Sequence, residues 1–73
     1  MSYTKHQEVY IRDFNFGKPT RIKGTIVAIL KNGFFNIKIE NGLDEGKIKR
    51  YSEFQITNMN YEEFLKHLEE EGI

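Results

Sequence analysis

Lysines, arginines and aromatic residues alternate along the central part of this chain, where cations could contact phosphates and rings could stack on bases. The candidate nucleic-acid-binding residues are Arg21, Lys23, Phe34, Lys38, Lys47, Lys49, Arg50 and Tyr51. Strict alternation points Arg50 inward beside Ile48, so a local bulge or an exposed strand end would have to release it. The pI of about 6.7 lies below that of a typical nucleic-acid-binding domain. Nucleic acid is therefore the alternative partner.

Groups that could carry catalysis or bind a metal are sparse and isolated. His6 and His67 lie far apart in the sequence without neighbouring metal-type ligands, and Ser2 and Ser52 belong to no recognisable nucleophile motif. The turn Asp44-Glu45 lacks the ligand spacing of a calcium loop. The sequence predicts a non-enzymatic protein with no catalytic residue, no metal and no cofactor.

Charge distribution and aromatic content favour a protein partner. Residues 1–52 carry ten Lys and Arg against five Asp and Glu, whereas residues 53–73 carry Lys66 alone against six Glu. The acidic end could meet a basic partner, fold back on the basic body or stay solvated. An aromatic ring left on the surface, at Phe16 in a loop or Phe34 beside a turn, would mark a contact patch. The candidate protein-contact residues are Phe16, Phe34, Glu69, Glu70 and Glu71.

Length and composition set the broad class. Seventy-three residues allow one domain, residues 1–73, with a modest core. The chain has no cysteine, which excludes a disulfide framework and a thiolate zinc site. No run approaches the roughly 18 apolar residues of a membrane span. We expect a cytoplasmic protein without membrane contact, a monomer or weak homo-oligomer, and the Lys, Asn and Ile content favours a bacterial or phage origin.

Residues 24–42 form the clearest local element, a predicted β-hairpin. Two alternating β-branched segments flank Asn32-Gly33, the dipeptide that most readily takes the two positive φ angles of a type I′ turn. Phe35, Ile37 and Ile39 are predicted to point inward. Gly24 on the inner face of the preceding segment indicates a close approach of backbone.

Alternation also predicts the other strands, at residues 8–14, 21–30, 34–40 and 47–52, with a short last strand around Phe54 and Ile56. The inner face of 21–30 is expected to hold Ile22, Gly24, Ile26, Ala28 and Leu30. Ile48 is the clearest inward residue of 47–52. Residues expected to share the core include Ile26, Phe35, Ile37, Ile48 and Leu65.

The C-terminal residues 60–71 change to a helical period. Tyr61, Phe64, Leu65 and Leu68 fall on one stripe of an amphipathic helix. Asn60 is a suitable N-cap, and Gly72 is placed to end the helix. The single apolar stripe predicts that the helix packs against an open side or end of the sheet.

The succession of strand, loop, long strand, tight hairpin, strand, short turn and strand resembles a five-stranded SH3-like barrel. The segments that carry the resemblance are Glu8-Val9-Tyr10-Ile11-Arg12, Lys23-Gly24-Thr25-Ile26-Val27, Phe35-Asn36-Ile37-Lys38-Ile39 and Ile48-Lys49-Arg50-Tyr51. The resemblance implies a mainly β fold, with a barrel over residues 7–58 and a C-terminal amphipathic α-helix over residues 60–71. It is a likeness of strand rhythm, and it implies no functional residue.

A second resemblance makes an OB-like barrel the alternative fold. Gly24–Gly42 is similar to the opening hairpin of the OB-fold in bacterial translation initiation factor one and related RNA-binding domains. That family continues with a His-Ile-Ser-Gly-Lys-like segment, where this chain has Leu43-Asp44-Glu45-Gly46-Lys47. Either fold implies a small binding module. A protein-interaction or regulatory accessory protein is the first expectation, and nucleic-acid binding is the second.

Overall fold

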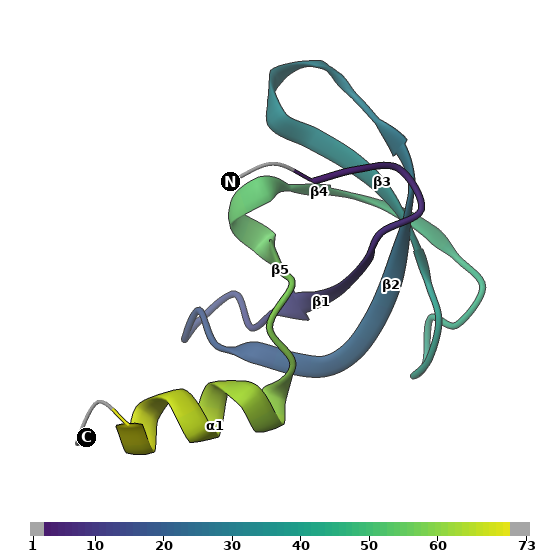
Figure 1. Ribbon diagram of the computed structural model, residues 1–73. Coiled ribbons are helices and arrows are strands. Elements are labelled where there is room, and N and C mark those ends of the chain that lie inside the picture. The colour runs from purple at the N-terminus through teal and green to yellow at the C-terminus, as the bar shows by residue number, and fades with distance from the viewer. Residues whose placement is uncertain (1–2, 71–73) are drawn as a thin grey trace.

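The computed structural model describes residues 3–70, which form one antiparallel β-sheet followed by a helix (Figure 1). The elements are β1 (Glu8–Arg12), β2 (Pro19–Ile29), η1 (Lys31–Gly33), β3 (Phe34–Ile39), β4 (Ile48–Ser52), η2 (Glu53–Gln55), β5 (Ile56–Thr57) and α1 (Tyr61–Glu70), where η1 and η2 are short 3-10 helices. The strand order is β4-β3-β2-β1-β5. The predicted mainly β class with a C-terminal helix is confirmed. Within the described residues β4 and β5 remain the two edges, so the bent sheet is not closed into a barrel.

The β2–β3 hairpin confirms the backbone angles predicted for Asn32 and Gly33, with φ of 66° and 77°. The connection differs from a two-residue turn, because Leu30 N–H donates to the Phe34 carbonyl at 2.8 Å and leaves three residues between them. A β-bulge between Ile26 and Ala28 shifts the register of β2 against β3 by one residue. The hairpin is therefore formed as predicted. The one-residue shift at the bulge is accompanied by a three-residue loop in place of a two-residue turn.

The core consists of apolar side chains from the inner faces of four strands. Its buried members are Val9, Ile11, Ile26, Phe35, Ile37, Ile39 and Ile56. The alternation predicted for β1 and β3 is confirmed. Tyr3 packs its ring edge-on against Phe35, with centroids 5.5 Å apart, so a residue before the first strand also covers the core.

The predicted phase of β4 is wrong by one residue. Ile48 is 60% exposed, whereas Tyr51 packs against the core. The cause is the pairing register, which sets Lys49 opposite the buried Ile37 and Tyr51 opposite Phe35. Since a shift of one residue moves every side chain to the other face, Arg50 lies on the outer face and needs no bulge to release it.

The predicted inner face of β2 is wrong at Ile22, Ala28 and Leu30, and the bulge accounts for the last two. Gly24 and Ile26 are buried as expected, but Ile22 and Leu30 are exposed. Ala28 is paired with Asn36 on the outer side, because the extra residue between Ile26 and Ala28 changes the alternation. The predicted close approach at Gly24 is confirmed: a Cβ there would overlap Cγ2 of Ile37 and lie 3.1 Å from the Lys38 carbonyl oxygen.

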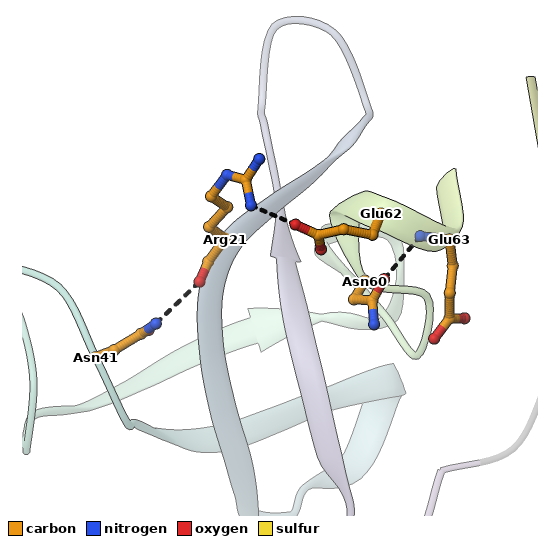
Figure 2. Close-up of polar contacts among 5 residues, drawn as sticks. All are labelled: Arg21, Asn41, Asn60, Glu62 and Glu63. Atoms are coloured by element: carbon orange, nitrogen blue, oxygen red, sulfur yellow. Dashed lines mark hydrogen bonds and ion pairs between the residues drawn. The ribbon is translucent and has the colours of Figure 1, made fainter. Parts of the chain in front are cut away.

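Helix α1 begins at Tyr61, as its capping signal predicts, and lies outside the sheet beside the first part of β2 (Figure 1). Glu63 N–H donates to the side-chain oxygen of Asn60 at 2.7 Å (Figure 2). No residue of Tyr61–Glu70 is buried, and Leu65 is 43% exposed. The prediction that Leu65 belongs to the core is therefore wrong, because the helix meets the sheet near its first turn. The predicted end at Gly72 lies outside the described residues.

Replacing the cap should unwind the start of α1 without unfolding the sheet. Asn60→Ala removes the acceptor for the Glu63 N–H, and loss of such a cap costs about 1 kcal/mol of helix stability. We expect the Cα chemical shifts of residues 61–64 to move toward coil values while those of β1–β3 stay unchanged. Glu63→Gln keeps the main-chain donor and serves as the control. Helical shifts that survive Asn60→Ala would show that packing on β2 defines the helix start.

Candidate protein-interaction surface

Phe14, Phe16 and Phe54 are exposed aromatic rings, and the partly buried ring of Tyr51 lies beside one of them. Phe16 in the β1–β2 loop is 75% exposed, and Phe54 in η2 is 80% exposed. Phe14, from the same loop, stacks on Tyr51 of β4 with centroids 6.5 Å apart and planes 22° apart. The loop therefore crosses toward the open side of the sheet and carries apolar area that the core does not use.

A cleft of about 450 Å³ lies between this loop and η2. It is lined by Tyr3, Arg12, Gly17, Glu53, Phe54 and Ile56. Phe54 forms part of the wall of the cleft. Phe16 is not a lining residue, but it directly precedes the lining residue Gly17 in the chain. The lining is mostly apolar carbon with charged groups from Arg12 and Glu53, which is the usual chemistry of a recognition site.

Hydrogen bonds hold the walls of the cleft in place. Arg12 donates from Nη1 to the Gly17 carbonyl at 2.6 Å and from Nε to the Ile56 carbonyl at 3.3 Å. The Tyr3 hydroxyl donates to the same Ile56 carbonyl at 3.4 Å, and burial raises the pKa of this phenol. Arg12 thus ties the β1–β2 loop to β5 and acts as a structural cation. Glu53 takes part in none of the ion pairs of residues 3–70, so its carboxylate is available to a partner.

The sequence of the β1–β2 loop explains why its rings point outward. The Asp13 side chain accepts from the N–H groups of Asn15 and Phe16 at 2.8 and 3.1 Å, and Gly17 takes a positive φ of 69°. Gly17 N–H donates to the Asp13 carbonyl at 2.8 Å, which closes the turn. Such a turn uses the local bonding capacity of Asp and the freedom of Gly. The loop backbone is thereby ordered, and Phe14 and Phe16 project from a fixed frame.

The candidate nucleic-acid-binding residues lie in several places rather than on one face. Asp44 accepts from Lys49 at 2.5 Å and lies 3.3 Å from Lys47; these hydrogen bonds, that from Lys49 foremost, lower the pKa of Asp44. Lys23 lies 3.6 Å from Glu8, and Arg21 is paired with Glu62. Four of the predicted phosphate-binding cations therefore already have a carboxylate partner.

The outer face of β3 and β4 brings together three of the remaining candidates, Phe34, Lys38 and Arg50. The Arg50 guanidinium lies 5.4 Å from the centre of the Phe34 ring, and Lys38 is on the same face opposite Ile48. Tyr51 lies on the other side of β4, against the core. Nucleic-acid binding by the full set of eight residues would need both sides of one strand, and the set stays a prediction.

The candidate protein-contact residues are accessible where the structure describes them. Phe16 and Phe34 are exposed, and Glu69 and Glu70 are exposed at the end of α1. Glu71 lies outside the described residues. Phe14 and Phe54 are not among the site residues that the sequence predicts. The sequence does contain a signal for η2, since Ser52 and Gln55 have the spacing of a capping box. In the structure the Ser52 N–H donates to the Gln55 side chain at 2.8 Å.

Residues 3–70 contain no group of three or more His, Cys, Asp or Glu side chains that could hold a metal ion. No helix among them is long and apolar enough to cross a membrane. Comparison with family models, curated proteins and solved structures finds no match to this chain.

Proposed function

We propose that this chain is a small non-enzymatic protein-interaction module that binds its partner through the cleft between the β1–β2 loop and η2. The observation that carries the proposal is the exposed Phe54 in the wall of a cleft that is held by hydrogen bonds. Phe14 and Phe16 are exposed on the β1–β2 loop, which contributes Gly17 to the same cleft. Among residues 3–70 seven apolar side chains are buried, whereas the rings of Phe14, Phe16 and Phe54 are each at least 69% exposed. Exposed aromatic groups of this kind are typical of recognition surfaces.

The proposed architecture is an SH3-like barrel in which a side-chain contact links the edge strand β4 to the β1–β2 loop. In its support, β1 pairs with both β2 and β5, while η2 carries the chain from one edge strand to the other. The Phe14–Tyr51 stack spans from the β1–β2 loop to the opposite edge strand. Side-chain contacts thus join elements that have no backbone ladder between them.

The partner that fits the cleft best is an extended, proline-containing segment with a basic residue. Aromatic-lined grooves bind such segments because a proline-rich chain loses little conformational entropy on docking. Glu53 provides a carboxylate at the cleft for the basic residue, and Phe54 and the Gly17 backbone provide apolar walls. Arg12 is engaged by two carbonyls and is not expected to bind the partner directly.

The test is selection of random dodecapeptides by the full chain, followed by fluorescence anisotropy on the selected peptides. We expect Phe54→Ala to weaken binding at least about tenfold, or about 1.4 kcal/mol. Because Phe54 is 80% exposed, its loss should leave the unfolding midpoint unchanged. Leu43→Ala is the matched control, since Leu43 is an exposed apolar residue outside this cleft.

Two results would count against the cleft. One is peptide affinity that Phe54→Ala leaves unchanged. The other is tight, salt-sensitive binding of oligonucleotides by the wild type that Arg50→Ala removes, which would assign function to Phe34, Lys38 and Arg50 on the outer face.

A further inference from the structure

Arg21 connects α1 to the sheet through its side chain. Its guanidinium pairs with Glu62 and lies 4.7 Å from the centre of the Tyr61 ring, so both contacts involve the first two residues of the helix (Figure 2). The Arg21 backbone is held in turn, because Asn41 donates to its carbonyl at 3.0 Å and accepts from Lys23 N–H at 2.8 Å. The start of the helix is thus fixed to β2 by polar contacts rather than by burial.

The rest of α1 leaves its apolar stripe incompletely covered. Phe64, Leu65 and Leu68 follow one another at helical spacing, and none of them is buried. Leu65 is exposed, whereas Phe64 and Leu68 are half-buried. A stripe of this width normally packs against an apolar surface, and the sheet of this chain covers it only in part.

The charges beside the stripe restrict what can cover it. Glu62 and Glu69 border one edge of the stripe at helical spacing, and Glu62 is already paired with Arg21. Glu63, Lys66 and Glu70 lie toward the opposite face of α1, where they are exposed. A second copy would bring two acidic helices together, and like charges disfavour that contact. Nucleic acid and anionic lipid are disfavoured for the same reason. A partner with an apolar groove that carries Lys or Arg along the edge facing Glu69 matches both the stripe and its charge.

We infer that α1 is a second interaction element, which docks its Phe64–Leu68 stripe into a basic, apolar groove of a partner protein. In this binding mode the groove of the partner contacts the apolar residues of the helix at positions i, i+3, i+4 and i+7. It is separate from the cleft, because α1 contributes no residue to the cleft lining. The chain would then contact partners at two places, through η2 with the β1–β2 loop and through α1.

A pair of synthetic peptides tests the inference. The first probe is a three-heptad Leu/Lys peptide with one apolar face, and the second has the same lysines with every Leu replaced by Ala. We expect the full chain to bind the Leu/Lys probe at least about tenfold more tightly than the Ala/Lys probe in fluorescence anisotropy. Leu65→Ala should weaken the Leu/Lys complex at least about fivefold, whereas the exposed Leu43→Ala should not change it.

Other outcomes each have a clear meaning. Equal affinity for the two probes, or no effect of Leu65→Ala, would overturn the inference, because charge alone would then explain the binding. Sedimentation that shows dimers of the free chain, abolished by Leu65→Ala, would overturn it in favour of a second copy. Phe54→Ala should leave binding of the Leu/Lys probe intact, so this inference and the function proposed for the cleft can fail separately.

Discussion

Ile37→Ala should lower the free energy of unfolding by about 2–5 kcal/mol, enough to unfold much of a domain of this size. Ile37 is completely buried at the centre of β3, opposite Ile26 of β2. Its truncation removes apolar contacts on a central strand, where backbone ladders on both sides limit how far the neighbours can relax into the cavity. The measurement is the denaturant midpoint at constant m-value.

Ile48→Ala is the matched control for this experiment. The sequence pattern alone gives both isoleucines an inward position, but Ile48 is 60% exposed. Its truncation should cost less than about 0.5 kcal/mol, as for most surface substitutions. Equal losses for the two variants would mean that β4 pairs in a different register, with Ile48 in the core and Tyr51 outside.

The difference between these two residues shows where pattern reasoning succeeds. β1 and β3 are interior strands, so one face of each must be apolar, and Val9, Ile11, Phe35 and Ile37 follow the predicted alternation. β4 is an edge strand of five residues, and Ile48 is its only aliphatic residue. The strand phase is then decided by which large side chain packs better. The Tyr51 ring lies against the core, so ring packing determines the phase of β4 and the hydropathy of Ile48 does not.

The candidate site was less predictable than the fold for a related reason. Phe16 could be recognised as a loop ring, because Gly17 and Pro19 mark that segment as a connection. The role of Phe54 depends on η2 lying beside the β1–β2 loop, far away in the sequence. Likewise, the pairing of Lys49 with Asp44 depends on the turn that brings them together. Local composition contains the cations and the rings, whereas the tertiary contacts decide which of them are free.

Gly24→Ala should also destabilise the protein, although intrinsic propensity points the other way. Replacing a strand glycine by alanine reduces the entropy of the unfolded chain and by itself would stabilise by about 0.4–1 kcal/mol. At Gly24 the new Cβ would overlap Cγ2 of Ile37 and approach the Lys38 carbonyl oxygen. Overpacking of this kind costs about 1–3 kcal/mol, so the steric term should decide the sign.

A double-mutant cycle separates this overlap from a general intolerance of β2 to substitution. Leucine carries no branch at Cβ, so Ile37→Leu removes the Cγ2 group that the alanine would meet. We expect Gly24→Ala to cost about 1 kcal/mol less in the Ile37→Leu background than in the wild type. The rescue should be partial, because the Lys38 carbonyl lies 3.1 Å from the new Cβ and belongs to the backbone of β3. Strictly additive effects would contradict this account and place the strain of Gly24→Ala in the backbone of β2.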